Sequence, residues 1–333
     1  MKLKTIFPLL LTAALTAVYA RAQAPVKPVS LFEYLTPGEG AGLTLSTDVS
    51  ALIANKNSPD YLPATLTDAS GKAFSAQVKP RGKYRRRISE IPPLKLKFKK
   101  KTLQSEGLDT LNELKIVLPI SLDKQGDELI VREYIAYKLF EQLTPVSVRA
   151  RLINLTLLNT GLGHEARYEV KAILLEDEEE TAARLGGQLV ELYGMPADSL
   201  HIRQAALTVM FQYMIGNTDW SIESQRNVRF LRDQNGQLLL IPFDFDFSGL
   251  VSAPYATPNA ITKTTHVRER FLMPHGIPET ALKQAAETLH AARETLLQVC
   301  RTEFLSKPAA RDIEDYLNSY FQSVEKNYKG IFR

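Results

Sequence analysis

The sequence predicts an α+β protein of two lobes, a β-rich N-terminal lobe followed by a mainly helical C-terminal lobe. Three observations lead to this fold class. Short segments between residues 43 and 118 alternate apolar and polar residues with the period of a strand. The acidic run Glu176-Asp-Glu-Glu-Glu180 then interrupts the chain, and most later segments have the period of a helix. The single cysteine, Cys300, cannot form an internal disulfide, so the core must hold the fold.

The first 22 residues have the pattern of a secretory signal peptide. Two lysines precede an apolar run over residues 6–18, and Ala20 and Ala22 have the small-residue spacing that signal peptidase recognises. The run is shorter than the ~20 apolar residues that a membrane-spanning helix needs. The alternative is an uncleaved membrane anchor. We expect an exported protein, periplasmic or extracellular, with no stable membrane span after signal cleavage.

The first lobe is predicted over residues 43–176, after a linker at residues 23–42. Strands are predicted at 43–48, 61–66, 73–78, 94–98 and 114–118, and together they would form an antiparallel sheet. Residues 128–143 have the spacing of an amphipathic helix that ends before Pro145. Two further strand-like segments, 146–158 and 168–175, are separated by a turn.

The second lobe is predicted over residues 177–333. Residues 200–215 form a long apolar helix, which should be buried. A hairpin follows, with strands at 227–231 and 237–241 around the turn Asp233-Gln-Asn-Gly236. Amphipathic helices are predicted at 278–304 and 309–328.

Candidate metal ligands cluster around this hairpin. Asp219 follows the apolar helix, Asn227 opens the first hairpin strand, and Asp244 and Asp246 follow the second. Carboxylate and amide oxygens suit Mg²⁺, which also keeps positions for water and phosphate. In phosphoryl transfer one Asp orients the attacking hydroxyl while an Asn and a second Asp hold the metal. The alternative is structural, because Asp and Asn are common turn residues and Asp219 can cap the segment that begins at Trp220.

Basic residues concentrate between Lys79 and Lys101, where 11 of the residues are Lys or Arg. Such a block attracts phosphates or acidic surfaces, or it is a solvated face of a β-ribbon. Lys95 and Lys97 share one face of their strand, and that face either lines a cleft or meets solvent. Glu133 can pair with one of these lysines. The net charge of +4 is too small to indicate a nucleic-acid partner.

Several of these segments resemble the spore coat protein H (CotH) kinase-like family of secreted or surface-associated atypical kinases. The resemblance extends over roughly residues 43–250. It rests on the segments Arg81-Gly82, Lys95-Leu-Lys-Phe98, Val131-Arg-Glu133, Ile173-Leu-Leu-Glu176, Gly216-Asn-Thr-Asp-Trp220 and Pro242-Phe-Asp-Phe-Asp246. The last two, in this order and separation, are the most specific.

The resemblance implies a bilobed atypical protein-kinase-like fold that binds ATP and Mg²⁺ between its lobes. It implies that Asp219 is catalytic and that Asn227, Asp244 and Asp246 form the metal site. The residues that it implies at the nucleotide are Lys95 or Lys97, Arg81, Glu133 and Glu176. The implied activity is ATP- and Mg²⁺-dependent phosphoryl or nucleotidyl transfer to a protein acceptor.

The sequence also departs from this pattern. Asn227 follows Asp219 by eight positions, whereas the usual kinase catalytic loop places the Asn five after the Asp. A G-x-G-x-x-G phosphate loop is absent from the sequence. Two alternatives therefore remain open: a catalytically inactive binding module of the cell envelope, and an envelope hydrolase that uses carboxylates as acid and base.

Overall fold

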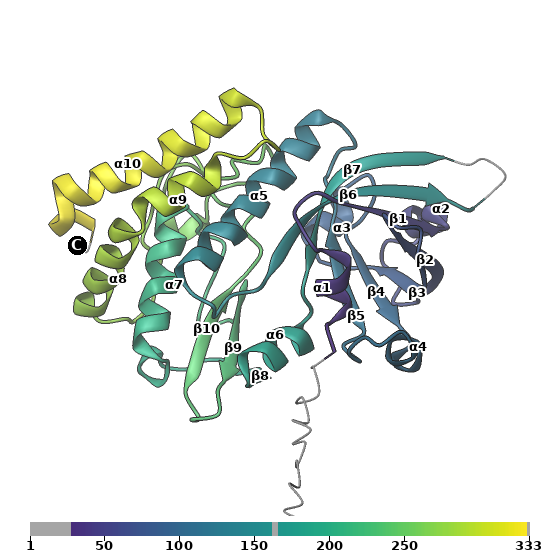
Figure 1. Cartoon of the computed structure of the whole chain (residues 1–333). Coiled ribbons are helices and arrows are strands. Elements are labelled where there is room, and N and C mark those ends of the chain that lie inside the picture. Colours follow the sequence, from purple (N-terminus) through teal and green to yellow (C-terminus); the bar gives the residue numbers. More distant parts are fainter. Residues whose placement is uncertain (1–27, 162–165, 332–333) are drawn as a thin grey trace, which may run out of the picture.

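The computed structural model describes residues 28–161 and 166–331, with side chains up to residue 325. The predicted signal peptide, residues 1–22, lies outside the described residues. Figure 1 shows two packed regions, a β-barrel formed by the first half of the chain and a mainly helical region formed by the second half. None of the helices in the described part of the chain has the length and apolar character needed to cross a bilayer.

Seven strands close into a barrel in the order β1-β2-β3-β4-β5-β7-β6. Their bounds are β1 (Ala41–Thr47), β2 (Leu62–Asp68), β3 (Ala73–Pro80), β4 (Leu94–Phe98), β5 (Glu113–Val117), β6 (Ala150–Asn159) and β7 (Arg167–Leu175). All neighbours are antiparallel except β1 and β6, which pair in parallel and close the ring. The alternating apolar residues, among them Leu45, Leu66 and Leu96, are buried in one core cluster.

The predicted fold class is therefore wrong. A bilobed kinase-like fold has a β-sheet lobe and a helical lobe, whereas this chain forms a closed seven-stranded barrel with helices packed beside it. Alternation of apolar and polar residues predicts that strands exist, but it does not show which strands pair. The closing pairs, such as Leu43 with Leu155, join residues more than a hundred positions apart. The sequence alone contains no signal for that contact.

Short helices fill the connections of the barrel. They are α1 (Leu31–Leu35), α2 (Val49–Ala54), α3 (Tyr84–Ile88) and α4 (Lys100–Ser105). The segment expected to be a linker, residues 23–42, contains α1 in its described part. The Ser30 hydroxyl caps this helix, the Glu33 side chain completes a capping box, and Leu31, Phe32 and Leu35 are buried.

The helical region begins with α5 (Lys124–Leu143), which crosses from the barrel and packs against β6 and β7. The elements after the barrel are α6 (Glu178–Leu185), β8 (Gln188–Val190), η1 (Ala197–Ser199), α7 (Ile202–Met214), β9 (Val228–Arg232), β10 (Leu238–Pro242), η2 (Ala260–Thr262), α8 (Glu279–Ala291), α9 (Arg293–Cys300) and α10 (Lys307–Ile331). The predicted hairpin is part of a three-stranded sheet with the order β10-β9-β8.

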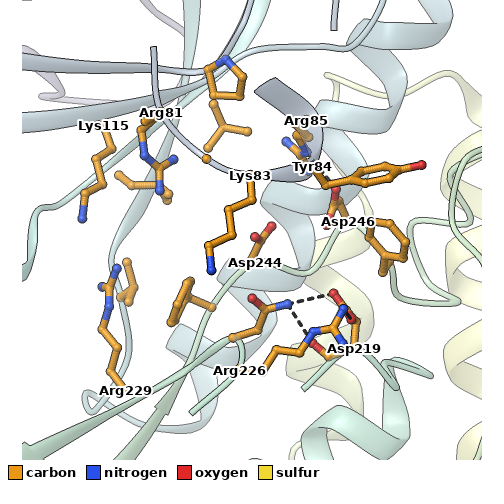
Figure 2. A pocket seen from close by; sticks show the side chains of 18 of the residues that line it. Arg81, Lys83, Tyr84, Arg85, Lys115, Asp219, Arg226, Arg229, Asp244 and Asp246 are labelled. Carbon is orange, nitrogen blue, oxygen red and sulfur yellow. Dashed lines mark hydrogen bonds and ion pairs between the residues drawn. The ribbon is translucent and has the colours of Figure 1, made fainter. Parts of the chain in front are cut away.

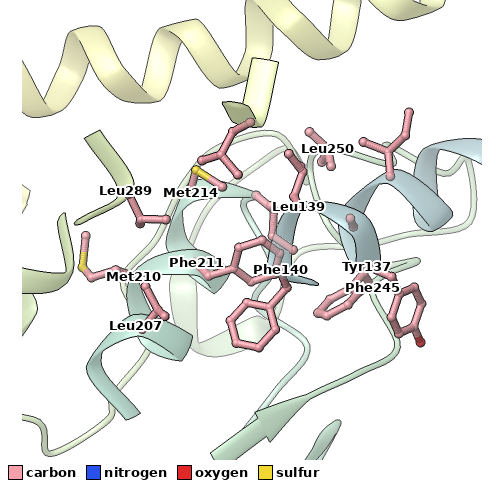
Figure 3. Close-up of a cluster of buried hydrophobic side chains, with 14 of the residues drawn as sticks. Tyr137, Leu139, Phe140, Leu207, Met210, Phe211, Met214, Phe245, Leu250 and Leu289 are labelled. Atoms are coloured by element: carbon pink, nitrogen blue, oxygen red, sulfur yellow. The ribbon is translucent and has the colours of Figure 1, made fainter. Parts of the chain in front are cut away.

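One aromatic cluster holds α5, α7 and the segment after β10 together (Figure 3). The rings of Phe140 and Phe211 lie 4.8 Å apart between centroids, and Phe211 and Phe245 lie 5.6 Å apart. Tyr137 packs edge-on against Phe245 at 4.7 Å. Phe245 lies between Asp244 and Asp246 in the sequence, so burial of its ring fixes the backbone that carries the two carboxylates.

A buried ion-pair cluster joins the barrel to the helical region. Arg85 of α3 pairs with Glu133 of α5 through one guanidinium nitrogen, and its Nε donates to Asp246 Oδ2 at 2.8 Å. The Tyr255 hydroxyl donates to the same carboxylate oxygen at 3.1 Å. The side chains of Arg85, Glu133 and Asp246 are each less than a tenth exposed. We call these three residues the Arg85 cluster.

Replacing Arg85 should destabilise the fold strongly. Arg85→Met leaves two buried carboxylates without their cation, and removing one partner of a buried ion pair costs about 3–5 kcal/mol. The matched control is Arg87→Met, because Arg87 lies on the same helix and is exposed. We expect urea denaturation to show a large fall in the free energy of unfolding for Arg85→Met only. Equal stability of the two variants would contradict this role for the Arg85 cluster.

Candidate functional site

A cavity of about 740 Å³ lies between the barrel and the helical region (Figure 2). Its walls come from the β3–α3 connection, β5, α5, the end of β7 and the loops on both sides of the β9–β10 hairpin. Of the residues singled out in the sequence, Arg81, Glu133, Glu176, Asp219, Asn227, Asp244 and Asp246 line it. These segments are far apart in the chain, and the fold brings them together.

Asp219 is held by the loop that follows α7. Its backbone N–H donates to the side chain of the buried Asn217 at 2.9 Å, and the indole N–H of Trp220 donates to the Asn217 carbonyl at 3.1 Å. The Asp219 carboxylate pairs with Arg226 and accepts a hydrogen bond from Asn227 Nδ2 at 3.0 Å. Burial raises the pKa of Asp219, and the charge of Arg226 opposes that shift.

Asn227 and Asp244 lie side by side at the base of the β9–β10 hairpin. The Phe243 N–H donates to the Asn227 carbonyl at 3.1 Å, which brings the two ends of the hairpin together. Both residues have left-handed backbones, with φ of 51° for Asn227 and 64° for Asp244. Such conformations are uncommon for residues other than glycine and are concentrated at functional sites.

The Asp244 carboxylate makes no hydrogen bond or ion pair with another described residue. Its position is nevertheless fixed, because its backbone N–H donates to the Tyr137 hydroxyl at 2.9 Å. Burial and the negative charge of Asp246 raise the pKa of Asp244 well above the usual carboxyl range, against the opposing charge of Arg85. A cation bound at this carboxylate would oppose that shift by stabilising the charged form.

Cations line the opposite wall of the pocket, where Figure 2 shows Arg81, Lys115 and Arg229 grouped together. Arg229 pairs with Glu178 at 2.5 Å and stacks on Phe243, 4.3 Å from the ring centroid. The Arg81 guanidinium has no hydrogen bond or ion pair with another described residue. Burial lowers the pKa of Arg81, although the charge of Asp244 opposes this.

Lys83 and Lys115 complete the cationic wall. Lys83 extends into the middle of the pocket toward Asp244 (Figure 2). Lys115 is buried and pairs with Asp177 at 3.0 Å and with Glu178. Burial, reinforced by the charge of Arg229, lowers the pKa of Lys115 to about 7, even though Asp177 favours the charged form.

Lys95 and Lys97 do not line the pocket. They pair with Glu113 on the neighbouring strand, at 2.5 Å and 3.3 Å. Lys115 is the register partner of Lys95 across β4 and β5, and of the two only Lys115 lines the pocket. Lys83 belongs to the basic segment that the sequence indicated as a candidate phosphate site, whereas Lys115, Arg226 and Arg229 were not singled out. A signal existed for Lys115, since it is the one charged residue in the apolar segment 114–118.

The two glutamates predicted at the nucleotide have structural partners. Glu133 belongs to the Arg85 cluster and contacts neither Lys95 nor Lys97 through an ion pair. Glu176 is fully buried and pairs with Arg149 at 2.8 Å and with Arg184 at 2.5 Å. Both side chains line the pocket. Their charges are therefore already matched by arginines.

The pocket contains side-chain oxygens of the kinds that magnesium binds in proteins. Among the described residues, no group of three or more His, Cys, Asp or Glu side chains is placed to hold a metal. The available oxygens are the Asp244 carboxylate, the second oxygen of Asp246 and the amide oxygen of Asn227, whose Nδ2 is turned toward Asp219. Magnesium typically takes one or two carboxylates and completes its shell with water and phosphate oxygens.

Comparison with known proteins adds no further assignment. No protein-family model matches the sequence, and a search of curated proteins finds no match. The resemblance to the CotH kinase-like family thus remains a prediction. The interpretation of the pocket rests on its own geometry.

Anion binding in the pocket should weaken as pH rises through about 7. Lys115 is charged below its pKa of about 7 and neutral above it, so a bound anion loses one favourable charge as pH rises. We expect the affinity for inorganic tripolyphosphate to fall between pH 6 and pH 8.5, by at most about tenfold per pH unit for this one group.

The matched variant is Lys115→Arg, which keeps its charge over this pH range. Tripolyphosphate titrates as well, so the measured quantity is the difference in calorimetric affinity between the native protein and the variant. A pH dependence identical in the two proteins would contradict the assignment to Lys115.

Proposed function

We propose that the pocket binds a nucleoside triphosphate such as ATP together with Mg²⁺, and that the protein transfers the terminal phosphoryl group to a hydroxyl of a protein acceptor outside the cytoplasm. The observation that carries this proposal is a carboxylate and a guanidinium that line one cavity, those of Asp244 and Arg81, neither of which makes a hydrogen bond or ion pair with another described residue. Their opposite charges act on each other across the cavity without direct contact. A metal with a polyphosphate supplies a partner for each.

The cationic wall fits a polyphosphate. Arg81, which is half-buried, and Lys83, which is exposed, both line the pocket without an ion pair to another described residue. Guanidinium groups match the geometry of phosphate oxygens and bind them through two parallel hydrogen bonds. Arg81 therefore has the position and the chemistry to bind a phosphate, and Lys83 and Lys115 add charge beside it.

An apolar wall beside the cations favours a nucleotide over inorganic polyphosphate. Val117, Val148 and Leu175 line the same cavity and belong to the main hydrophobic core. A flat base would bury apolar area against them. The volume of about 740 Å³ lies in the range of cofactor sites, which is about 300–1,000 Å³.

Asp244 and Asn227 would hold Mg²⁺, with Asp246 beside them. When bound, the ion would neutralise the negative charge that develops on the phosphates during transfer. The Arg85 cluster fixes Asp246 through one oxygen, and the hydrogen bond from the Asp244 N–H to Tyr137 fixes the chain next to it. The left-handed backbones of Asn227 and Asp244 are consistent with residues held in place for a ligand.

Asp219 is placed to act as the base. In the proposed reaction the acceptor hydroxyl oxygen bonds to the terminal phosphorus, the bond to the bridging oxygen breaks, and the nucleoside diphosphate leaves. The hydroxyl proton passes to Asp219. The hydrogen bond from Asn227 orients this carboxylate and leaves lone pairs free for the proton. The raised pKa of Asp219 makes it a better proton acceptor.

A second candidate, a binding module without turnover, is favoured by one observation. Arg226 pairs directly with Asp219, and this ion pair competes with any proton that the carboxylate would accept. In that case the pocket would bind a nucleotide or another anion, and the bound state alone would be functional. Measurements of turnover distinguish the two candidates.

Three substitutions in the pocket should have three different effects. Arg81→Met should weaken calorimetric binding of ATP by at least about tenfold, since a hydrogen bond to a charged group contributes about 1.5–3 kcal/mol. Asp244→Asn should abolish the increase in ATP affinity that Mg²⁺ produces. Asp219→Asn should keep binding and lower phosphoryl transfer by about 10²–10⁴-fold, the contribution typical of a general base.

The control is Lys99→Met, an exposed position outside the pocket, which should behave as the native protein. Transfer is followed with radiolabelled ATP and a mixture of envelope proteins. Folded protein that binds neither ATP, other nucleoside triphosphates nor their Mn²⁺ complexes would refute the proposal. Nucleotide binding that depends on Arg81 and Asp244 without any turnover would instead establish the binding module.

A further inference from the structure

We propose that the acceptor is an acidic protein segment, which docks on α3 and on Arg226 at the mouth of the pocket. This inference rests on the proposed function, because it names the acceptor class of the same site. Figure 2 separates the two sides of the cavity. Arg81, Lys115 and Arg229 lie on one side, and Asp219, Arg226 and Tyr84 lie on the other. An acceptor hydroxyl must reach Asp219, so the second side is where it enters.

Three cations at and just before α3 have no carboxylate partner. Lys83, Arg86 and Arg87 form no ion pair with another described residue, although the Arg87 guanidinium lies over the Tyr84 ring, 5.8 Å from its centroid. Arg85, in contrast, points inward to Glu133 and Asp246. One arginine of the run Arg85-Arg86-Arg87 thus anchors the helix, and the remaining charges are left for a partner. An anionic partner is the one that they attract.

Aromatic side chains from α3 and from the segment after β10 pack together beside the pocket. Tyr84 packs against Phe247 with centroids 5.2 Å apart and against Tyr255 at 6.0 Å. Tyr84 is 38% exposed, and Ile88 on the same helix is 39% exposed. Tyr84 and Phe247 also line the pocket. Such a surface offers apolar contact to a peptide chain and cations to its acidic side chains.

Arg226 links docking to the reactive group. Its side chain is 57% exposed, yet it pairs with the less exposed Asp219. A carboxylate of the acceptor would compete for this guanidinium and release Asp219. The hydroxyl next to that carboxylate would then meet an available base. An acidic acceptor would thus promote its own phosphorylation. Water carries no carboxylate, so it would leave Asp219 paired with Arg226.

The dimensions favour a protein over the other polyanions. The helix α3 has five residues, so it is about 7.5 Å long, which is enough for two or three acidic side chains. Specific binding of nucleic acid commonly uses six or more phosphate contacts along an extended surface. The charge of the whole chain, +4, is also small for a nucleic-acid or membrane surface. Tighter binding of nucleic acid or of anionic membranes through these arginines would therefore count against the proposal.

The test measures binding of fluorescent peptides by anisotropy, without nucleotide, to the full chain. The probes are one serine flanked on each side by three glutamates, and the same peptide with glutamines. We expect the glutamate peptide to bind at least tenfold more tightly. The double variant Arg86→Glu/Arg87→Glu should remove this preference, and Arg226→Gln should reduce it at least threefold. The matched control is Lys101→Glu, a charge reversal on α4, which should change affinity by less than twofold.

Equal affinity for the two peptides would overturn the inference, as would an equal loss in the Lys101→Glu variant. So would tighter binding of a single-stranded oligonucleotide, or of vesicles containing phosphatidylglycerol, through the same arginines. Failure of the proposed function can be distinguished from failure of peptide docking, because ATP binding is measured on the pocket variants without peptide. In the presence of Mg²⁺ and ATP, Arg226→Gln should also raise ATP hydrolysis relative to peptide phosphorylation, a ratio that a merely structural arginine would not change.

Discussion

The buried ion pairs of Arg85 with Glu133 and Asp246 are the interaction on which the pocket depends. Arg85 belongs to the barrel, Glu133 to the helix that leaves it, and Asp246 to the segment after β10. Arg81 and Lys83 precede Arg85 by only a few residues, and Asp244 precedes Asp246 by two. The same three side chains therefore hold the cationic segment and the acidic segment facing each other across one cavity.

This arrangement satisfies some charges and leaves others unmatched. Glu133, Glu176 and Asp246 each have an arginine partner, so they contribute to structure. Asp244 and Arg81 line the pocket without a hydrogen bond or ion pair to another described residue, and only their longer-range attraction offsets their charges. Burial disfavours the charged form of each group. On this basis we propose a ligand that carries both kinds of charge, such as a metal-bound polyphosphate.

The sequence was most informative where the relevant contacts are local. The hairpin around Asp233 and the apolar helix before Asp219 could be predicted, and with them the convergence of Asp219, Asn227 and Asp244 on one end of the hairpin. Long-range contacts could not be predicted. The parallel pairing of β1 with β6 closes the barrel, and no local pattern indicates it.

The cationic wall shows the same limit. Alternation places Lys95 and Lys97 on one face of their strand, but only the pairing of β4 with β5 shows that Lys115, opposite Lys95, is the lysine that reaches the pocket. Likewise, three consecutive arginines at 85–87 are equivalent in the sequence. Their roles differ because Glu133 and Asp246, each well over forty residues away, meet only Arg85. Assigning function to a charge run requires the contacts that neutralise part of it.

The most direct test is a crystal structure of the mature protein grown with Mn²⁺ and a non-hydrolysable ATP analogue, with anomalous scattering used to locate the metal. We expect an anomalous peak about 2.1 Å from the Asp244 carboxylate, with the Asn227 amide oxygen and phosphate oxygens completing the shell and Arg81 on the phosphates. A nucleotide bound elsewhere, or a metal that does not contact Asp244, would contradict the central claim that this pocket is a metal-polyphosphate site.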